Sequence, residues 1–107
     1  MLTEFVKVAS VSDLADGEMR GVTVGEAQVL IARAADQYYA VNNVCSHFYT
    51  LLSNGDFFPA ECQVQCPLHD SCFDLRTGEP TDPPAEDPIE VYEVRIEGDD
   101  IFAGPKG

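Results

Sequence analysis

The chain has 107 residues, of which 45% are hydrophobic and 23% charged, a composition typical of one soluble globular domain with a modest core. Its 19 acidic and 6 basic residues give a formal net charge of −13, so its surface repels nucleic acid and anionic lipid. We find no long apolar run and no basic segment leading into one. We therefore expect no membrane span, no signal peptide and a cytoplasmic location, where thiols stay reduced or bind metal.

The first part of the chain shows the pattern of short strands. Alternation predicts a strand over Phe5–Val8, and one helical turn is expected within Ser10–Asp16. Apolar, β-branched and aromatic residues then predict three strands, the first two joined as a hairpin: Met19–Val24, Ala27–Ala34 and Gln37–Asn42.

The second part begins with turn chemistry at residues 53–56 and again at 76–79. Residues 80–88 include four prolines and predict an extended loop. Clean alternation predicts a strand over 89–96, and the last strand is expected over 101–103. Because no helical pattern exceeds a turn or two, we expect an all-β fold.

Two short motifs supply metal ligands, Cys45-Ser46-His47 and Cys66-Pro67-Leu68-His69, and they contain the only two histidines of the chain. A Rieske-type [2Fe–2S] cluster needs two thiolates on one iron and two imidazoles on the other. Eighteen residues separate His47 from Cys66, enough for a hairpin-like return that brings the motifs together. The four residues therefore predict a carrier of single electrons.

Structural zinc is the alternative, since two Cys and two His also suit that ion. Zinc sites usually pair like with like, whereas each motif here mixes one thiol with one imidazole. A disulfide between Cys45 and Cys66 is a poorer interpretation, because it leaves both histidines unexplained.

Several stretches besides the two motifs support a family resemblance, namely Tyr39-Ala40-Val41, Leu52-Ser53-Asn54-Gly55 and Phe73-Asp74-Leu75-Arg76-Thr77-Gly78-Glu79-Pro80. The chain resembles, over nearly its whole length, bacterial Rieske-type ferredoxins of aromatic-ring-hydroxylating dioxygenases such as the biphenyl and carbazole systems. The resemblance implies a single Rieske domain over 1–107. It also implies an antiparallel β-sandwich-like base with an inserted cluster-binding subdomain at about 43–80, and a cluster near the surface with both histidines exposed.

The resemblance also implies the role of the protein. It would carry one electron at a time from an NAD(P)H-dependent flavin ferredoxin reductase to a terminal oxygenase, most simply as a monomer. It would not be an enzyme, because the cluster uses both histidines and leaves none for a mononuclear iron site. Two alternatives stay open: a Rieske-like small subunit of a nitrite reductase, and a zinc-stabilised interaction module without redox role.

Three residues near the second motif are candidates for tuning the reduction potential. High-potential relatives carry a hydroxyl two residues after the second histidine and a tyrosine four residues after it. Ser71 and Phe73 occupy these positions, so the resemblance implies that one of the two hydrogen bonds can form. Asp70 stands where the family usually has glycine; its carboxylate would depress the potential if it faced the cluster, or would simply face solvent.

High-potential relatives also carry a disulfide between the two loops. The corresponding positions here are Thr50 and Leu68, so that bridge is absent. Cys62 and Cys72 are then expected to be buried as small hydrophobic residues rather than to form a second disulfide.

We expect the cluster tip to be the docking face, with electrons leaving through the exposed edge of His47 or His69. The candidates for its apolar centre are Phe48, Tyr49, Leu68 and Pro84, and those for its acidic rim are Asp56, Asp70, Asp82, Glu86 and Asp87. In an alternative arrangement, Phe48 and Tyr49 fold back over the cluster. An acidic rim suits a basic patch on a partner.

Overall fold

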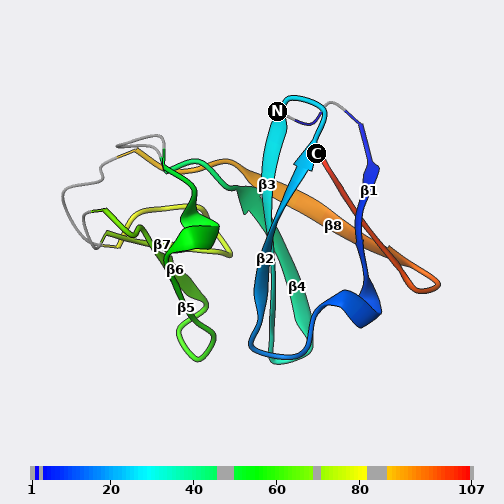
Figure 1. The fold of residues 1–107 in the computed structure, drawn as a ribbon, viewed down its shortest axis with the longest axis horizontal. Coiled ribbons are helices and arrows are strands. Elements are labelled where there is room, and N and C mark those ends of the chain that lie inside the picture. The colour runs from blue at the N-terminus through cyan, green and yellow to red at the C-terminus, as the bar shows by residue number, and fades with distance from the viewer. Residues whose placement is uncertain (1, 3, 46–49, 69–70, 82–86, 107) are drawn as a thin grey trace.

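A computed structural model describes residues 2, 4–45, 50–68, 71–81 and 87–106. These residues form two antiparallel sheets (Figure 1), a large one in the order β1-β9-β8-β4-β3-β2 and a small one in the order β5-β6-β7. The strands are β1 Val6–Ser10, β2 Met19–Val24, β3 Ala27–Ala34, β4 Gln37–Asn42, β5 Asp56–Phe58, β6 Gln63–Gln65, β7 Cys72–Asp74, β8 Val91–Glu97 and β9 Asp100–Gly104. Two 3₁₀ turns, η1 Val11–Asp13 and η2 Leu52–Asn54, are the helical elements of the described chain. None of them is long or apolar enough to cross a bilayer.

The all-β prediction is confirmed, and β2, β3 and β4 have the predicted bounds. The helical turn expected within Ser10–Asp16 is shorter, a 3₁₀ turn over Val11–Asp13. The strand predicted from residue 89 begins at Val91 instead. The reason is that the Ile89 amide donates to the Gly78 carbonyl (2.8 Å), which ties Ile89 to a turn rather than to a neighbouring strand.

Strand β3 is buried on both faces, which explains its unbroken apolar run. Val29 and Ile31 face a base core within the large sheet, whereas Leu30 and Ala32 face a second core. This second core, the shared core, also contains residues of the cysteine-rich segment: Val41, Cys45, Leu52, Cys62, Val64, Cys66, Phe73, Leu75 and Ile89. The large sheet therefore serves as a wall on which the small sheet rests.

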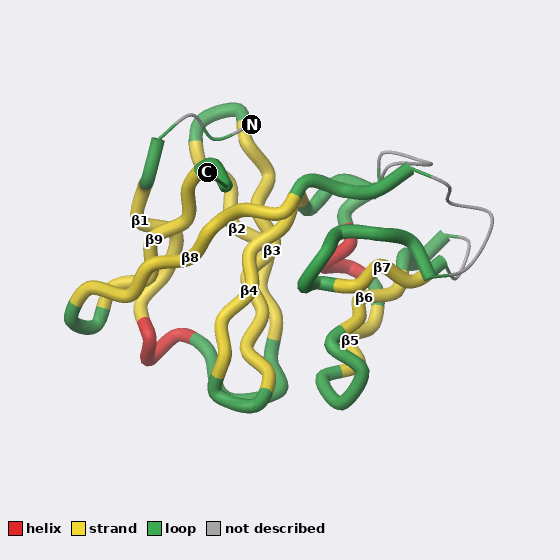
Figure 2. Tube along the Cα trace, turned by 180° about the vertical axis from the view of Figure 1, so that it is seen from behind, coloured by secondary structure: helices red, strands yellow, loops and turns green. Residues whose placement is uncertain are grey.

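The small sheet was not predicted from the sequence, because its three strands have only three residues each. Figure 2 shows it on one side of the molecule, with β1 and β9 on the opposite side. Gly55 allows its first strand to approach β6, since a Cβ at this position would overlap the carbonyl oxygen of Gln65. The cysteine-rich segment is thus a compact unit packed against the wall.

Candidate metal centre

Both motif cysteines open a six-residue loop that is closed in the same way. The Cys45 amide donates to the Thr50 carbonyl, and the Cys66 amide donates to the Ser71 carbonyl, each over 2.8 Å. We call residues 45–50 the first cysteine loop and 66–71 the second cysteine loop. Each closing bond thus joins the cysteine amide to the carbonyl five residues later in the chain.

Different elements carry the two loops. The second cysteine loop joins β6 to β7, and the pair Gln65–Cys72 closes the ladder beneath it. The first cysteine loop follows β4 and leads into η2; an isolated bridge between Val44 and Leu51 lies at its base. The second loop is therefore the end of a β-hairpin, whereas the first is a connection whose ends, among the described residues, are not held by a strand ladder.

Both motif thiols lie in the shared core. Cys45 and Cys66 are each 0% exposed and belong to one cluster of buried side chains. No disulfide joins any of the four cysteines, all of which the structure describes. His47 and His69 lie outside the described residues, and the remaining residues contain no group of three or more Cys, His, Asp or Glu around one point. Two water-excluded thiols at the starts of matched loops fit the thiolate side of a mixed-ligand cluster.

The structure describes some of the tuning and docking candidates. Ser71 and Phe73 are both 0% exposed, and Phe73 packs in the shared core. Leu68 is 64% exposed, and Asp56 and Asp87 are exposed as well. The other candidates lie outside the described residues: His47, Phe48, Tyr49, His69, Asp70, Asp82, Pro84 and Glu86.

Cys62 and Cys72 are buried, each 7% exposed, as the sequence predicted. Burial is the main cause that raises the pKa of the Cys62 thiol, and a hydrogen bond with the Tyr39 side chain partly opposes it. Burial is likewise the main cause that raises the pKa of Tyr39, and the neighbouring Cys62 raises this pKa further. Both groups are therefore neutral, and their bond joins β4 of the wall to the residue directly before β6.

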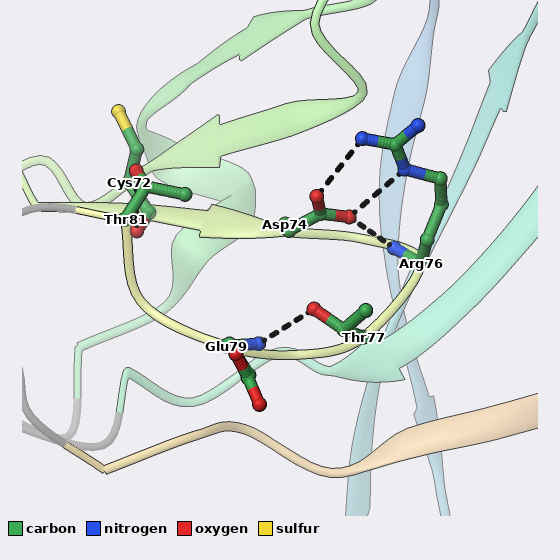
Figure 3. A network of polar contacts seen from close by, with 6 residues as sticks. All are labelled: Cys72, Asp74, Arg76, Thr77, Glu79 and Thr81. Carbon is green, nitrogen blue, oxygen red and sulfur yellow. Dashed lines mark hydrogen bonds and ion pairs between the residues drawn. The ribbon is translucent and has the colours of Figure 1, made fainter.

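Beyond β7, an ion pair organises the turn that the sequence placed at 76–79 (Figure 3). The Asp74 carboxylate accepts bonds from the Arg76 amide (2.7 Å), Nε (3.2 Å) and a terminal guanidinium nitrogen (3.0 Å). The side-chain bond from Arg76 is the main cause that lowers the pKa of Asp74. Gly78 has φ +79°, which favours glycine, and a Cβ there would overlap the Ile89 carbonyl oxygen. This pairing escaped the sequence analysis, although the stretch Asp74–Gly78 was part of the family resemblance.

Two buried thiols, each followed in the sequence by a histidine, are the residue types of an iron–sulfur protein with mixed cysteine and histidine ligands. The chain matches the model of the Rieske [2Fe-2S] domain over residues 4–93 and belongs to that family. Its cofactor is accordingly a Rieske-type [2Fe–2S] cluster, and the family match argues against the zinc interpretation. When bound, the cluster supplies reversible one-electron chemistry.

The relatives of this chain include ferredoxins of dioxygenases. It is 36% identical to ferredoxin CarAc of Metapseudomonas resinovorans over 104 residues, 95% of either chain. The ferredoxin of carbazole 1,9a-dioxygenase from Nocardioides aromaticivorans IC177 is 36% identical, with a TM-score of 0.90 over 97% of this chain and 100% of that one. A third similar structure is a chain from the complex of reduced oxygenase and oxidized ferredoxin in carbazole 1,9a-dioxygenase. It is 32% identical, with a TM-score of 0.88 over 98% of this chain and 97% of that one.

The fold also occurs in a protein described as a putative nitrite reductase small subunit. That structure has a TM-score of 0.75 over 92% of this chain and 96% of that one, but only 19% identity. At this identity the likeness shows the shared fold alone, so the nitrite reductase alternative has weaker support than the ferredoxin interpretation.

Proposed function

We propose that this protein is the one-electron carrier of an aromatic-ring-hydroxylating dioxygenase system. It takes electrons from an NAD(P)H-dependent flavin reductase and delivers them to a terminal oxygenase in the cytoplasm. The observation that carries the proposal is the match in length and fold to the carbazole dioxygenase ferredoxin, 97% of one chain against 100% of the other. The protein is an electron carrier rather than an enzyme, as its relatives named ferredoxin are.

The proposed ligands are Cys45 and Cys66 on one iron and His47 and His69 on the other. Burial of both thiols in the shared core supports the first half of this assignment. The apolar surroundings keep water from the thiolate side. We assign the cluster-binding unit at about 43–80 to a single domain over 1–107, and the shared core, which joins this unit to β3 and β4, supports the assignment.

The proposed docking face is the tip around the second cysteine loop. Leu68, 64% exposed beside the second motif histidine, gives this tip a large apolar contact. Asp56 and Asp87 are exposed and supply part of the acidic rim. Small contacts of this kind suit a carrier that visits two partners in turn and acts as a monomer.

The first test is an EPR spectrum of the dithionite-reduced protein. A rhombic signal with the low average g of mixed histidine and cysteine ligation is expected, and it should disappear in Cys45→Ala. A colourless, EPR-silent protein with one zinc per chain would overturn the electron-transfer function in favour of an interaction module.

The second test places the carrier between its partners. Purified reductase and terminal oxygenase of a carbazole-type system should turn over an aromatic substrate only when the holoprotein is added, and Leu68→Ser should slow turnover while preserving the EPR signal. Support of nitrite reduction, with none of aromatic hydroxylation, would favour the nitrite reductase alternative instead.

A further inference from the structure

Asn43 is a buried polar residue two positions before Cys45. It is 1% exposed, and its backbone is bonded on both sides: its amide donates to the Gln28 carbonyl (2.9 Å), and its carbonyl accepts from Leu52 (2.7 Å). The first bond reaches the beginning of β3, and the second reaches η2 beyond the first cysteine loop. The backbone of Asn43 thus already joins the wall to both ends of that loop.

The side chain of Asn43 adds a reciprocal pair of bonds to Ser53. Asn43 Oδ1 accepts from the Ser53 amide (2.8 Å), and Asn43 Nδ2 donates to Ser53 Oγ (2.9 Å). We call these two bonds the Asn43–Ser53 clamp. They satisfy one donor and one acceptor of a side chain that would otherwise be buried at high cost.

Strand β2 leaves space for this clamp. Gly21 lies beside it, and a Cβ there would come within 2.6 Å of Ser53 Oγ and 2.7 Å of Asn43 Nδ2. Such distances require one of the atoms to move, so an alanine at 21 would press on the clamp without removing either polar group. The clamp can therefore be disturbed from outside the cysteine loops.

The first cysteine loop needs this fastening more than the second does. The second loop ends the hairpin of β6 and β7, so ladder bonds hold both its ends. In the part of the chain that the structure describes, the first loop is held by the isolated bridge Val44–Leu51 with its two flanking backbone bonds, Cys45 to Thr50 and Leu52 to Asn43, and belongs to no longer ladder. The Asn43–Ser53 clamp lies directly outside that bridge and ties residues on either side of the loop.

We propose that Asn43, acting with Ser53, is a positioning residue that holds Cys45 in place as a cluster ligand. The proposal rests on the assignment of Cys45 as a ligand. Without the clamp, the two ends of the first cysteine loop separate more often, water reaches the thiolate side, and iron leaves faster. A cluster held less uniformly also gives a broader distribution of ligand geometries.

The experiment compares holoprotein variants in two measurements, the rate of iron release to a ferrous chelator after reduction, and the EPR line width. Asn43→Ala removes both clamp bonds and should release iron about tenfold faster, because each lost hydrogen bond contributes roughly threefold. Ser53→Ala keeps the bond from its amide and should release iron about threefold faster. Gly21→Ala should broaden the EPR lines in the same way as Ser53→Ala.

Two control variants separate positioning from general stability. Asn54→Ala changes the exposed neighbour of Ser53, and Ile101→Val removes a methyl group from the base core, where Ile101 is 0% exposed. Both should release iron at the wild-type rate, although Ile101→Val lowers the melting temperature. The double variant Asn43→Ala/Ser53→Ala should match Asn43→Ala alone, since the first change has already removed both clamp bonds.

The proposal is overturned if Ser53→Ala and Gly21→Ala keep wild-type iron release and line width, or if Ile101→Val releases iron as fast as Ser53→Ala. Should Asn43→Ala fail to fold, the Ser53 and Gly21 variants decide the matter. A wild-type protein without the Rieske EPR signal would instead refute the proposed function, so the two failures are distinguishable.

Discussion

Ser71 is the residue whose hydroxyl we expect to adjust the reduction potential. It is fully buried at the end of the second cysteine loop, where its carbonyl already accepts the Cys66 amide. If its hydroxyl donates to the cluster, Ser71→Ala should lower the midpoint potential by on the order of 40 mV, the one-electron equivalent of about 1 kcal/mol. A redox titration followed by circular dichroism measures it. An unchanged midpoint would refute the hydrogen bond, and Thr23→Ala on β2 serves as the control.

Asp74 should make stability depend on pH in the acid range. Its pKa is lowered chiefly by the side-chain bond from Arg76, so the ionised carboxylate stabilises the folded state. This contribution is complete above the unfolded pKa of about 3.9 and is lost as the pH falls through the lower folded pKa. Asp74→Asn should cost about 1 kcal/mol at pH 7 and flatten the acid limb of the stability curve.

Urea titrations between pH 2 and 7 would check this expectation. Asp99→Asn, at an exposed turn between β8 and β9, is the matched control and should retain the wild-type pH profile. An equal loss of stability from Asp74→Asn at pH 2 and pH 7 would show that ionisation of Asp74 does not contribute.

The turn between β3 and β4 carries backbone strain that a substitution can relieve. Ala35 and Asp36 both have positive φ, 51° and 62°. Asparagine tolerates this region better than alanine, so Ala35→Asn should raise the free energy of unfolding by about 0.5–1 kcal/mol. Asp36 is best left unchanged, because it pairs with Arg33 over 2.9 Å. A higher melting temperature than wild type is expected, whereas Ala60→Asn at an exposed position should have no effect.

At the scale of elements, the sequence predicted those strands whose pattern is long. The run from Ala27 to Ala34 was recognisable as a strand, but only the structure shows that its two faces serve two cores. The three-residue strands of the small sheet were missed, because alternation over so few residues has no period to detect. Cys62 has a φ of +57°, and no rule for its residue type predicts that.

The candidate site was also predictable only where its residues form a recognisable local pattern in the sequence. The motif cysteines were found because their spacing to histidine is unusual, and their burial in one cluster agrees with that prediction. Asn43 and Ser53 were missed, because a buried amide and a hydroxyl ten residues apart carry no local pattern. Their pairing depends on how η2 packs against Gly21 of β2, which is a property of tertiary structure.

For the whole molecule, the shared core decides how the electron carrier is built. Leu30, Ala32 and Val41 of the large sheet pack directly against the core of the small sheet. The large sheet therefore acts as a support, and the small sheet lies on the opposite side of the molecule from β1 and β9 (Figure 2). A partner docked as proposed would contact the tip without disturbing the base core.

We expect charge to set how fast partners find the proposed docking tip. The net charge is −13, and Arg76 is the only Lys or Arg between Arg33 and Arg95. Because Arg76 is paired with Asp74, acidic groups dominate this part of the chain. We expect the second-order rate of electron delivery to a terminal oxygenase with a basic docking patch to fall about tenfold as ionic strength rises from about 10 to 300 mM.

Stopped-flow oxidation of the reduced carrier by the oxygenase would measure this dependence. Asp56→Asn and Asp87→Asn should slow the reaction at low salt, since both carboxylates are exposed in the part of the chain assigned to docking. Asp99→Asn removes the same charge at the β8–β9 turn, on the opposite side of the molecule (Figure 1), and should leave the rate near wild type. Equal effects from all three would mean that overall charge, rather than an acidic rim at the tip, steers the encounter. A rate independent of salt would exclude electrostatic steering altogether, and the exposed Leu68 would then be the main determinant of docking.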